Sequence, residues 1–204
     1  SNIISYSVDN DLKAAITYHS HPIVKNIPRS IIVSGGAMNL QKRESKIDDK
    51  GNVVQLSIAV DDGLYAIYDM EYDEYGNIVK ITKSANNNDE RVSMSLKYDD
   101  LQHLYPIQVS DSYGFTSYMT YDTLFYKPIK QTDINGSSVI YSYDKRGRLS
   151  TVLAPNEQKD KKPYTLRFAY LLTDSICKGI TYHNSPEGEF EVYSFVDSLG
   201  RAKY

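Results

Sequence analysis

The segment Tyr143-Asp144-Lys145-Arg146-Gly147-Arg148-Leu149 carries the motif that organises this chain, because close copies of it recur along the sequence. Each copy has an aromatic or β-branched residue, then Asp, two variable residues, Gly, Arg or Asn, and an apolar residue. Three further copies begin at Tyr72, Ile47 and Val196. A motif that recurs along one chain indicates a repeat architecture, in which each copy is one structural unit.

The residue types of the motif predict a tight hairpin turn. An Asp at the first turn position accepts hydrogen bonds from backbone N–H groups further on, and a Gly three residues later takes the positive φ that closes the hairpin. The repeat turns are therefore assigned to Asp48 and Gly51; Tyr72, Asp73 and Gly76; Asp111 and Gly114; Asp133 and Gly136; Tyr143, Asp144, Gly147 and Arg148; and Asp197, Gly200 and Arg201.

Some copies depart from the full motif. The turns at Asp111 and Asp133 lack the Arg or Asn. After Asp99 and Asp122, the glycine position holds Gln102 and Phe125, so we expect those two turns to close in another way. Where an Arg follows the glycine, as in Arg148 and Arg201, we expect it to reach back toward the Asp carboxylate, and an exposed pair of this kind adds at most about 1 kcal/mol.

The spacing of the aspartates predicts short strands between the turns. Asp111, Asp122, Asp133 and Asp144 follow one another at intervals of 11 residues, which fits one strand of about seven residues plus a four-residue turn. The intervening segments alternate with period two, as in residues 92–98, where apolar side chains alternate with Ser and Lys. Short turns join only antiparallel neighbours, so the sequence predicts an all-β fold, an antiparallel meander of β-hairpins.

Tyrosine is overrepresented: the chain has 19 Tyr, five Phe and no Trp. A tyrosine directly before the turn Asp favours the strand, stacks across the ladder and keeps its hydroxyl at the strand end, which explains much of the excess without a binding site. Tyr65, Tyr75 and Tyr113 lie in or near turns outside that position. These three are the candidate platform for stacking on a ligand.

Charge and hydropathy exclude two function classes. The net charge is -3 with a pI near 5.8, so no positive field draws the chain to nucleic acid. No apolar run approaches the roughly 18 residues of a membrane span. The single cysteine, Cys177, cannot form an internal disulfide and lacks the paired spacing of a zinc site.

We expect one domain over residues 1–204. Residues 1–46 form less regular strands, residues 47–149 regular repeats, and residues 150–204 further hairpins interrupted by an exposed loop at 153–163. A polar turn is expected at 85–90 and a helical turn only at 39–45. The chain ends in a turn followed by the first residues of a strand, so we expect a segment of a longer polypeptide.

The Tyr-Asp pairs followed by Gly-Arg-Leu or Gly-Asn-Ile at hairpin spacing resemble the YD repeat of the Rhs family, which includes teneurins and the B and C components of toxin complexes. The resemblance is carried by residues 143–149 and by Asp197-Ser198-Leu199-Gly200-Arg201, and it spans roughly residues 45–204. It implies a hollow shell wound from β-hairpins around a C-terminal toxic or signalling segment, in a secreted or cell-surface protein. About 200 residues is too few for a closed shell, so the expectation is a piece of its wall.

Other chemistry is weakly indicated. The plug motif with Asp and Pro, which the resemblance associates with self-cleavage, is missing from this segment. His19 and His21 share a face of an extended segment but have no identifiable third metal ligand, and Cys177 has no activating signature. The turn aspartates occupy equivalent positions and do not converge as catalytic carboxylates would. The sequence therefore predicts no catalytic residue, no metal and no cofactor.

Two functions remain open. The first is a non-enzymatic structural segment of a bacterial Rhs/YD-repeat protein, whose partners are further repeats and an enclosed or displayed cargo domain of the same polypeptide. The second is a carbohydrate- or protein-binding β module at the cell surface, which would bind a glycan or a receptor through exposed tyrosines. An enzyme is not expected.

Overall fold

The computed structural model describes residues 5–8, 12–85, 91–172, 177–185, 187–196 and 202–203. The fold is all-β and its strands follow one another as an antiparallel meander, which confirms the predicted fold class. The chain divides into two compact units, Ser1–Phe115 and Thr116–Tyr204. Each unit is described separately below.

In the first unit every strand pairs antiparallel with the next one along the chain. The strands are β1 (Ser5–Val8), β2 (Leu12–Tyr18), β3 (Pro28–Gly35), β4 (Met38–Ile47), β5 (Val53–Asp61), β6 (Leu64–Tyr72), β7 (Ile78–Ala85), β8 (Arg91–Tyr98) and β9 (Pro106–Asp111).

The second unit has the same connectivity, with one short helix inserted. Its elements are β10 (Thr116–Tyr121), β11 (Pro128–Thr132), β12 (Ser138–Tyr143), β13 (Leu149–Leu153), α1 (Pro155–Lys159), β14 (Leu166–Leu172), β15 (Cys177–Ser185), β16 (Gly188–Val196) and β17 (Ala202–Lys203).

Two local predictions were wrong. Residues 39–45, expected as a helical turn, lie in β4, where Gln41 is opposite Val33 and Arg43 is opposite Ile31 on β3. Their helix-forming side chains are outweighed by pairing with the apolar strand β3. The loop at 153–163 contains helix α1, which begins at a proline and is tied to β13 through the Gln158 side-chain amide and the Leu153 carbonyl, 3.0 Å apart.

Two predicted turns lie outside the described residues. The polar turn at 85–90 falls mostly within the undescribed residues 86–90. The last repeat turn, with Asp197, Gly200 and Arg201, falls within the undescribed residues 197–201. The assignments of these residues therefore stay predictions.

In β5–β9 of the first unit, most apolar side chains lie on one face and most polar ones on the other, because directly opposed residues share a face and the patterns of these strands agree in phase. Leu56 is opposite Tyr68, and Leu96 is opposite Val109. The mainly apolar face carries Leu56, Ile58, Tyr68, Met70, Ile81, Met94, Leu96 and Val109, together with Lys83 and Asp111. The mainly polar face carries Gln55, Ser57, Asp69, Glu71, Lys80, Thr82, Ser93, Ser95, Lys97 and Gln108, together with Ile67.

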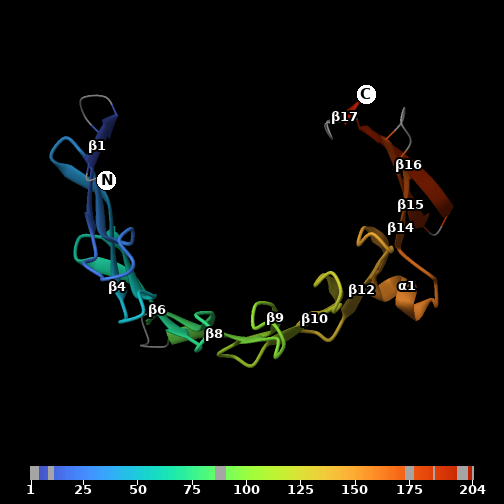
Figure 1. Cartoon of the computed structure of the whole chain (residues 1–204), viewed down its shortest axis with the longest axis horizontal. Helices are drawn as coiled ribbons and strands as arrows, with labels where there is room; N and C mark the ends of the chain where they lie inside the picture. Colours follow the sequence, from blue (N-terminus) through green and yellow to red (C-terminus); the bar gives the residue numbers. More distant parts are fainter. Residues whose placement is uncertain are drawn as a thin grey trace. The chain divides into compact units, whose positions relative to one another are not determined.

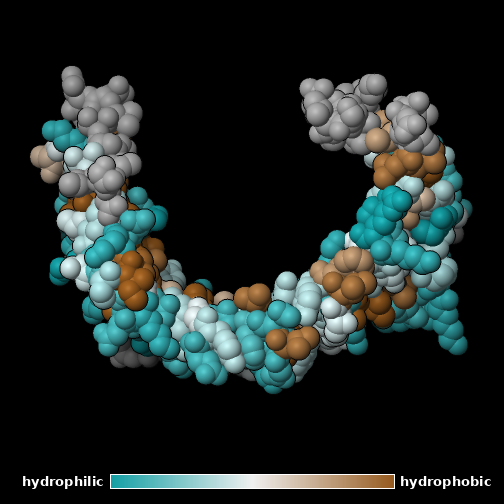
Figure 2. Space-filling view, viewed as in Figure 1, coloured by the Kyte–Doolittle hydropathy of each residue, from teal (hydrophilic) through white to brown (hydrophobic). Residues whose placement is uncertain are grey.

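Neither unit has a second layer over its sheet in the part of the chain that the structure describes (Figure 1). Among the described side chains larger than glycine, only Ala14 and His21 are buried, and large apolar side chains reach the surface of both units (Figure 2). The accessible surface is 14560 Å². A compact protein of this mass exposes about 9,700 Å², so the sheet leaves much apolar surface uncovered.

Candidate functional site

The aspartate of each full repeat holds its own turn together. One oxygen of Asp48, Oδ1, accepts the backbone N–H groups of Lys50 and Asn52 at 2.9 and 2.8 Å. The other oxygen, Oδ2, accepts the side-chain amide of Asn52 at 3.0 Å. Asp73 makes the same three bonds with Tyr75 and Asn77. Because both oxygens are engaged, the carboxylate serves as the structural centre of the turn.

In the repeat that ends in arginine, the turn aspartate also forms an ion pair. Asp144 accepts the backbone N–H groups of Arg146 and Arg148, and its Oδ2 also accepts the guanidinium of Arg148 through Nε and a terminal nitrogen, both at 2.7 Å. The Arg148 guanidinium also lies 4.3 Å from the ring centre of Tyr170. The backbone N–H of Arg148 and its guanidinium, together with the N–H of Arg146, hold the pKa of Asp144 below its usual value against the opposing effect of desolvation.

The glycines occupy the left-handed region that the motif requires. Gly51, Gly76, Gly114, Gly136 and Gly147 have φ between +72° and +89°. Each donates its N–H to the carbonyl of the turn aspartate, for example Gly147 to Asp144 at 2.9 Å. At each full repeat the strand pairing shifts by one residue beside the turn, as at Tyr143, which indicates a type I turn closed by a glycine bulge.

The two turns without glycine are one or two residues longer. After Asp99 the left-handed residue is His103, and after Asp122 it is Tyr126, both one position later than the glycine of the other turns. Partial desolvation of Asp99 acts to raise its pKa, but backbone N–H groups, those of Gln102 and Tyr105 foremost, lower it to about 2. A longer loop thus replaces the glycine while the aspartate keeps its role.

The tyrosine before the aspartate makes a hydrogen bond that sequence reasoning did not identify. Its hydroxyl donates to the backbone carbonyl of the first residue of the preceding strand. These tyrosine bridges join Tyr72 to Val53 at 2.9 Å, Tyr98 to Ile78 at 3.0 Å and Tyr143 to Pro128 at 2.7 Å. Tyr170, inside β14, makes the same bond to Leu149 at 2.8 Å. The hydroxyl explains why the motif carries Tyr and not Phe.

The bridges place each phenol close to the aspartate of the neighbouring turn. Burial raises the pKa of Tyr72, and the negative charge of Asp48 raises it further. Burial and Asp73 act in the same way on Tyr98. The phenol of one repeat and the carboxylate of the previous one therefore interact electrostatically, and the neutral phenol is favoured.

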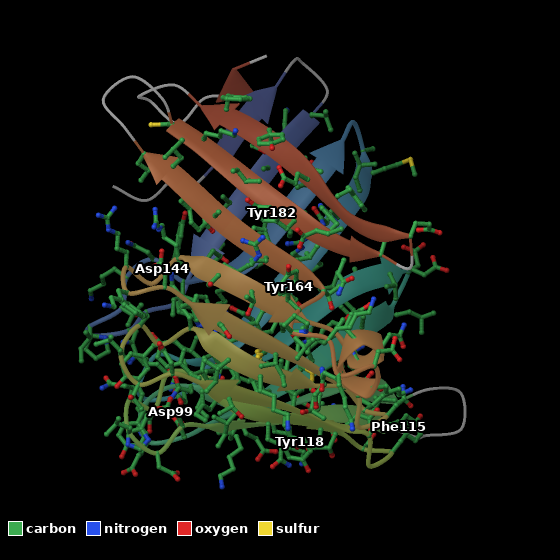
Figure 3. All side chains as sticks on the ribbon, turned by 90° about the vertical axis from the view of Figure 1, so that its right-hand side faces the viewer. Asp99, Phe115, Tyr118, Asp144, Tyr164 and Tyr182 are labelled. Atoms are coloured by element: carbon green, nitrogen blue, oxygen red, sulfur yellow. The ribbon has the colours of Figure 1, made fainter. Side chains whose placement is uncertain are left out.

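All tyrosine bridges lie at one end of the strands. In a meander, consecutive turns alternate between the two strand ends, so the turns after β4, β6 and β8 share one end in the first unit, and those after β10 and β12 share one end in the second. We call this end the tyrosine margin of each unit; Asp144 lies on it (Figure 3). The turns at Asp111 and Asp133 lie at the opposite margin, where Ser110 and Thr132 stand in place of the tyrosine.

Neighbouring turns contact one another along the tyrosine margin. In the first unit the rings of Tyr75 and His103 stack with centroids 3.8 Å apart, and the Asn77 side-chain amide donates to the His103 carbonyl. In the second unit Lys127 donates to the Gly147 carbonyl, and the Phe125 ring lies against the Gly147 backbone. Each unit thus has a pair of neighbouring turns in direct contact on its tyrosine margin.

The candidate tyrosine platform is not brought together. Tyr65 lies on β6 near the turn at 61–63 and Tyr113 in the turn at 111–114, both at the margin opposite the tyrosine margin. Tyr75 lies on the tyrosine margin, in the turn at 73–77. Tyr65 lines a cavity of about 310 Å³, with Asn39, Gln41, Lys42, Asp61 and Asp62 among its lining residues.

The described residues hold no group of three or more His, Cys, Asp or Glu side chains placed to bind a metal ion. The imidazole Nε2 of His19 contacts the Ser45 hydroxyl, whereas His21 contacts the Asp49 carbonyl, so the two rings have different partners. Cys177 is a free, half-buried thiol at the start of β15. Within that same part of the chain, no helix has the length and apolar character needed to cross a membrane.

No protein-family model matches the chain, and no curated protein matches it. Its fold is similar to part of a solved structure described as TcdB2-TccC3, with a TM-score of 0.65 and 11% identity over 97% of this chain. This chain spans only 16% of the length of that one. The toxin-complex-like fold that the repeat resembles is thus the fold observed.

Two more solved structures are similar at lower TM-scores. A complex described as TcdB2-TccC3-TEV gives 0.45 at 12% identity, covering 94% of this chain and 12% of that chain. The Tc holotoxin pore of Photorhabdus luminescens gives 0.44 at 14% identity, covering 94% of this chain and 11% of that chain.

Proposed function

We propose that this chain is a non-enzymatic wall segment of a bacterial Rhs/YD-repeat protein, part of a β-hairpin shell that encloses or displays a C-terminal toxin or effector. The observation that carries the proposal is the tyrosine margin: bridges such as Tyr143 to Pro128 fix each hairpin to the one before it. Because each strand pair is bonded to the previous one in the same way, further repeats can extend the sheet. The partners are further repeats and the cargo of the same polypeptide, and the protein is secreted or at the cell surface.

The uncovered sheet supports this role. A single-layer sheet with a sorted apolar face, such as that of Leu56, Tyr68 and Leu96 in the first unit, gains stability when other polypeptide packs against it.

The test is electron cryo-microscopy of the native polypeptide that carries this segment. We expect residues 5–203 to form part of a continuous sheet around an internal volume that contains other residues of the same polypeptide. A structure in which this segment folds as an isolated module, outside any shell, would contradict the proposal.

A second function is favoured by the cavity at Tyr65. Its hydroxyl is held by the ammonium of Lys42 at 3.1 Å, and Lys42 in turn pairs with Glu44 at 3.1 Å. A fixed aromatic ring beside the carboxylates of Asp61 and Asp62 offers a stacking face and hydrogen-bond acceptors, the chemistry that recognises a sugar ring. The proposed ligand is a glycan.

Screening on a glycan array tests this second function. Reproducible binding that is lost in Tyr65→Ala and in Asp61→Asn, but kept in Tyr113→Ala, would support a saccharide site at this cavity. Tyr113 is the matched control because it is an exposed turn tyrosine at the same margin as Tyr65. Absence of binding at high glycan density would contradict the saccharide site, and the wall role would remain as the proposed function.

A further inference from the structure

His21 is the one polar side chain that is buried among the described residues, with 7% of its surface exposed. It lies in the segment 19–27, which joins β2 to β3 at the tyrosine margin of the first unit. Neither the repeat nor the proposed wall function requires a histidine there. Burial of an imidazole is costly unless its nitrogens are satisfied.

The hydrogen bonds of His21 fix its protonation state. The ring nitrogen Nδ1 accepts the backbone N–H groups of Ile23 and Val24 at 3.3 and 3.1 Å. The other ring nitrogen, Nε2, lies 3.0 Å from the carbonyl oxygen of Asp49. A carbonyl only accepts, so Nε2 carries the hydrogen, and Nδ1 must present its lone pair to two donors. The site is therefore built for the neutral imidazole.

This ring connects two segments that are distant in the sequence. Through Nδ1 it closes the turn at 21–24, and through Nε2 it holds the first repeat turn, at 48–52. The two segments are also closely packed, and Gly51 leaves no room for a side chain between them. A Cβ added at Gly51 would lie 2.8 Å from Cγ2 of Val24 and 3.6 Å from Cε1 of His21. The segment 19–27 thus covers the start of the regular repeats.

We propose that His21 is an acid-sensitive latch that releases segment 19–27 from the first repeat turn when its imidazole is protonated. Protonation adds a hydrogen at Nδ1, which then points at the N–H groups of Ile23 and Val24. Both acceptor bonds are lost, and a positive charge sits in a site shielded from water. Because protonation removes both acceptor bonds of the closed form, we expect acidification to favour opening and rising pH to favour closure.

The charged groups nearest to His21 carry both signs. On the repeat turn these are Asp48, Asp49 and Lys50, and on the same segment as His21 they are His19 and Lys25. The side-chain amide of Asn52 foremost, with the backbone N–H groups of the turn, lowers the pKa of Asp48, so this carboxylate stays ionised throughout the titration of a histidine. The Asp48 carboxylate accepts hydrogen bonds from Lys50 and Asn52 of its own turn, and Asp49 contacts the His21 ring through its backbone carbonyl.

Amide hydrogen exchange on the full chain tests the latch. Protection of the Ile23 and Val24 amides, corrected for intrinsic exchange, should fall about fivefold or more between neutral and mildly acidic pH, the effect of losing one net hydrogen bond. In His21→Asn the side-chain oxygen keeps an acceptor that does not titrate, so the pH dependence of these two amides should disappear. His183→Asn, which removes an imidazole stacked on Phe190 in the second unit, should retain it.

Nitrogen chemical shifts of the His21 ring complete the test. At neutral pH they should report hydrogen on Nε2 alone. The proposal is overturned if the ring becomes protonated while Ile23 and Val24 stay equally protected, or if the pH dependence persists in His21→Asn. The wild-type ring and amide measurements decide the matter on their own if the variant fails to fold.

Discussion

The residue that distinguishes this repeat from an ordinary hairpin is the tyrosine before the turn aspartate. Aspartate and glycine alone close a turn, as they do at Asp133 and Gly136, where Thr132 precedes the aspartate. The tyrosine adds a bond between strands at the position where the ladder begins. Tyr72, Tyr98 and Tyr143 all donate to a carbonyl at the first residue of the neighbouring strand, which would otherwise lack this partner.

Removing one hydroxyl should therefore be measurable. In Tyr143→Phe the ring and its contact with Lys127 remain, but the carbonyl of Pro128 loses a donor 2.7 Å away. We expect the free energy of unfolding to fall by about 1 kcal/mol in urea denaturation, the net value of one such bond. Tyr113→Phe, at a side chain that is 66% exposed, should change it by less than about 0.5 kcal/mol. Equal effects of the two changes would contradict the role of the bridge.

The bridges also predict how stability changes at alkaline pH. The pKa of Tyr72 and that of Tyr98 are raised in the fold, first by burial and then by Asp48 and Asp73 respectively. Above about pH 10 the unfolded chain loses these protons more readily than the folded chain, so the stability from the neutral phenols declines as pH rises further. Urea denaturation at increasing alkaline pH should show this decline, and the Tyr72→Phe/Tyr98→Phe variant should show a shallower one. An unchanged slope in that variant would count against the shifted phenols.

At the scale of strands and turns, the sequence predicted the elements better than their arrangement. The Asp-x-x-Gly pattern has a mechanism, so it located hairpin turns such as those at Asp73 and Asp144. The interval of 11 residues marks one strand, and because turns alternate, the structural repeat is a pair of strands. An even number of strands separates each of the turns that follow Tyr72, Tyr98, Tyr121 and Tyr143 from the next one. Because consecutive turns alternate between the two strand ends, this count alone would have predicted that the four turns lie on the same margin of their units.

Other features depend on contacts that no local pattern contains. The left-handed conformations of His103 and Tyr126 follow from longer turns whose aspartates take up extra N–H groups. Burial of His21 depends on a turn 28 positions away in the sequence. Residues 39–45 became a strand because β3 and β5 lie on either side of β4. In each case a distant segment decides the outcome.

Turn-to-turn packing predicts unequal effects at two similar glycines. Gly136 and Gly147 have φ of +79° and +72°, so alanine at either position should cost about 1–2 kcal/mol in backbone strain. A Cβ at Gly136 meets open space, whereas one at Gly147 lies 2.8 Å from the Phe125 ring. We expect Gly147→Ala to lower the free energy of unfolding by about a further 1–3 kcal/mol, as overpacking does.

Urea denaturation of both glycine variants and of Phe125→Leu completes this comparison. The smaller leucine should recover part of the loss in the Gly147→Ala/Phe125→Leu double variant, since the two positions are in contact. The same double change built on Gly136→Ala should be additive. Equal costs for the two alanines would show that the turns of the second unit do not press on one another.

At the scale of the whole molecule, the chain is ordered by local pairing and not by a central core. In the part of each unit that the structure describes, strands pair with the strands consecutive to them in the sequence. In β5–β9 most polar and most apolar side chains lie on opposite faces. The exposed area of 14560 Å² is about one and a half times that of a compact protein of 23.2 kDa. Stability therefore comes from ladders, turns and bridges, while the apolar face adds to it only once covered.

Because the isolated chain buries less surface than a compact protein, we expect a smaller heat capacity change when it unfolds. Folding from an extended chain buries about four fifths of the area that a compact protein of this length would bury. Because the heat capacity change of unfolding follows the area exposed, we expect it to be about four fifths of the usual value of roughly 2.4–3.1 kcal/mol/K for 204 residues. Scanning calorimetry measures this quantity, and sedimentation equilibrium identifies the monomeric concentration range. A full-sized heat capacity change in the monomer would mean that the two faces are covered within the chain itself, and the wall role would lose its physical basis.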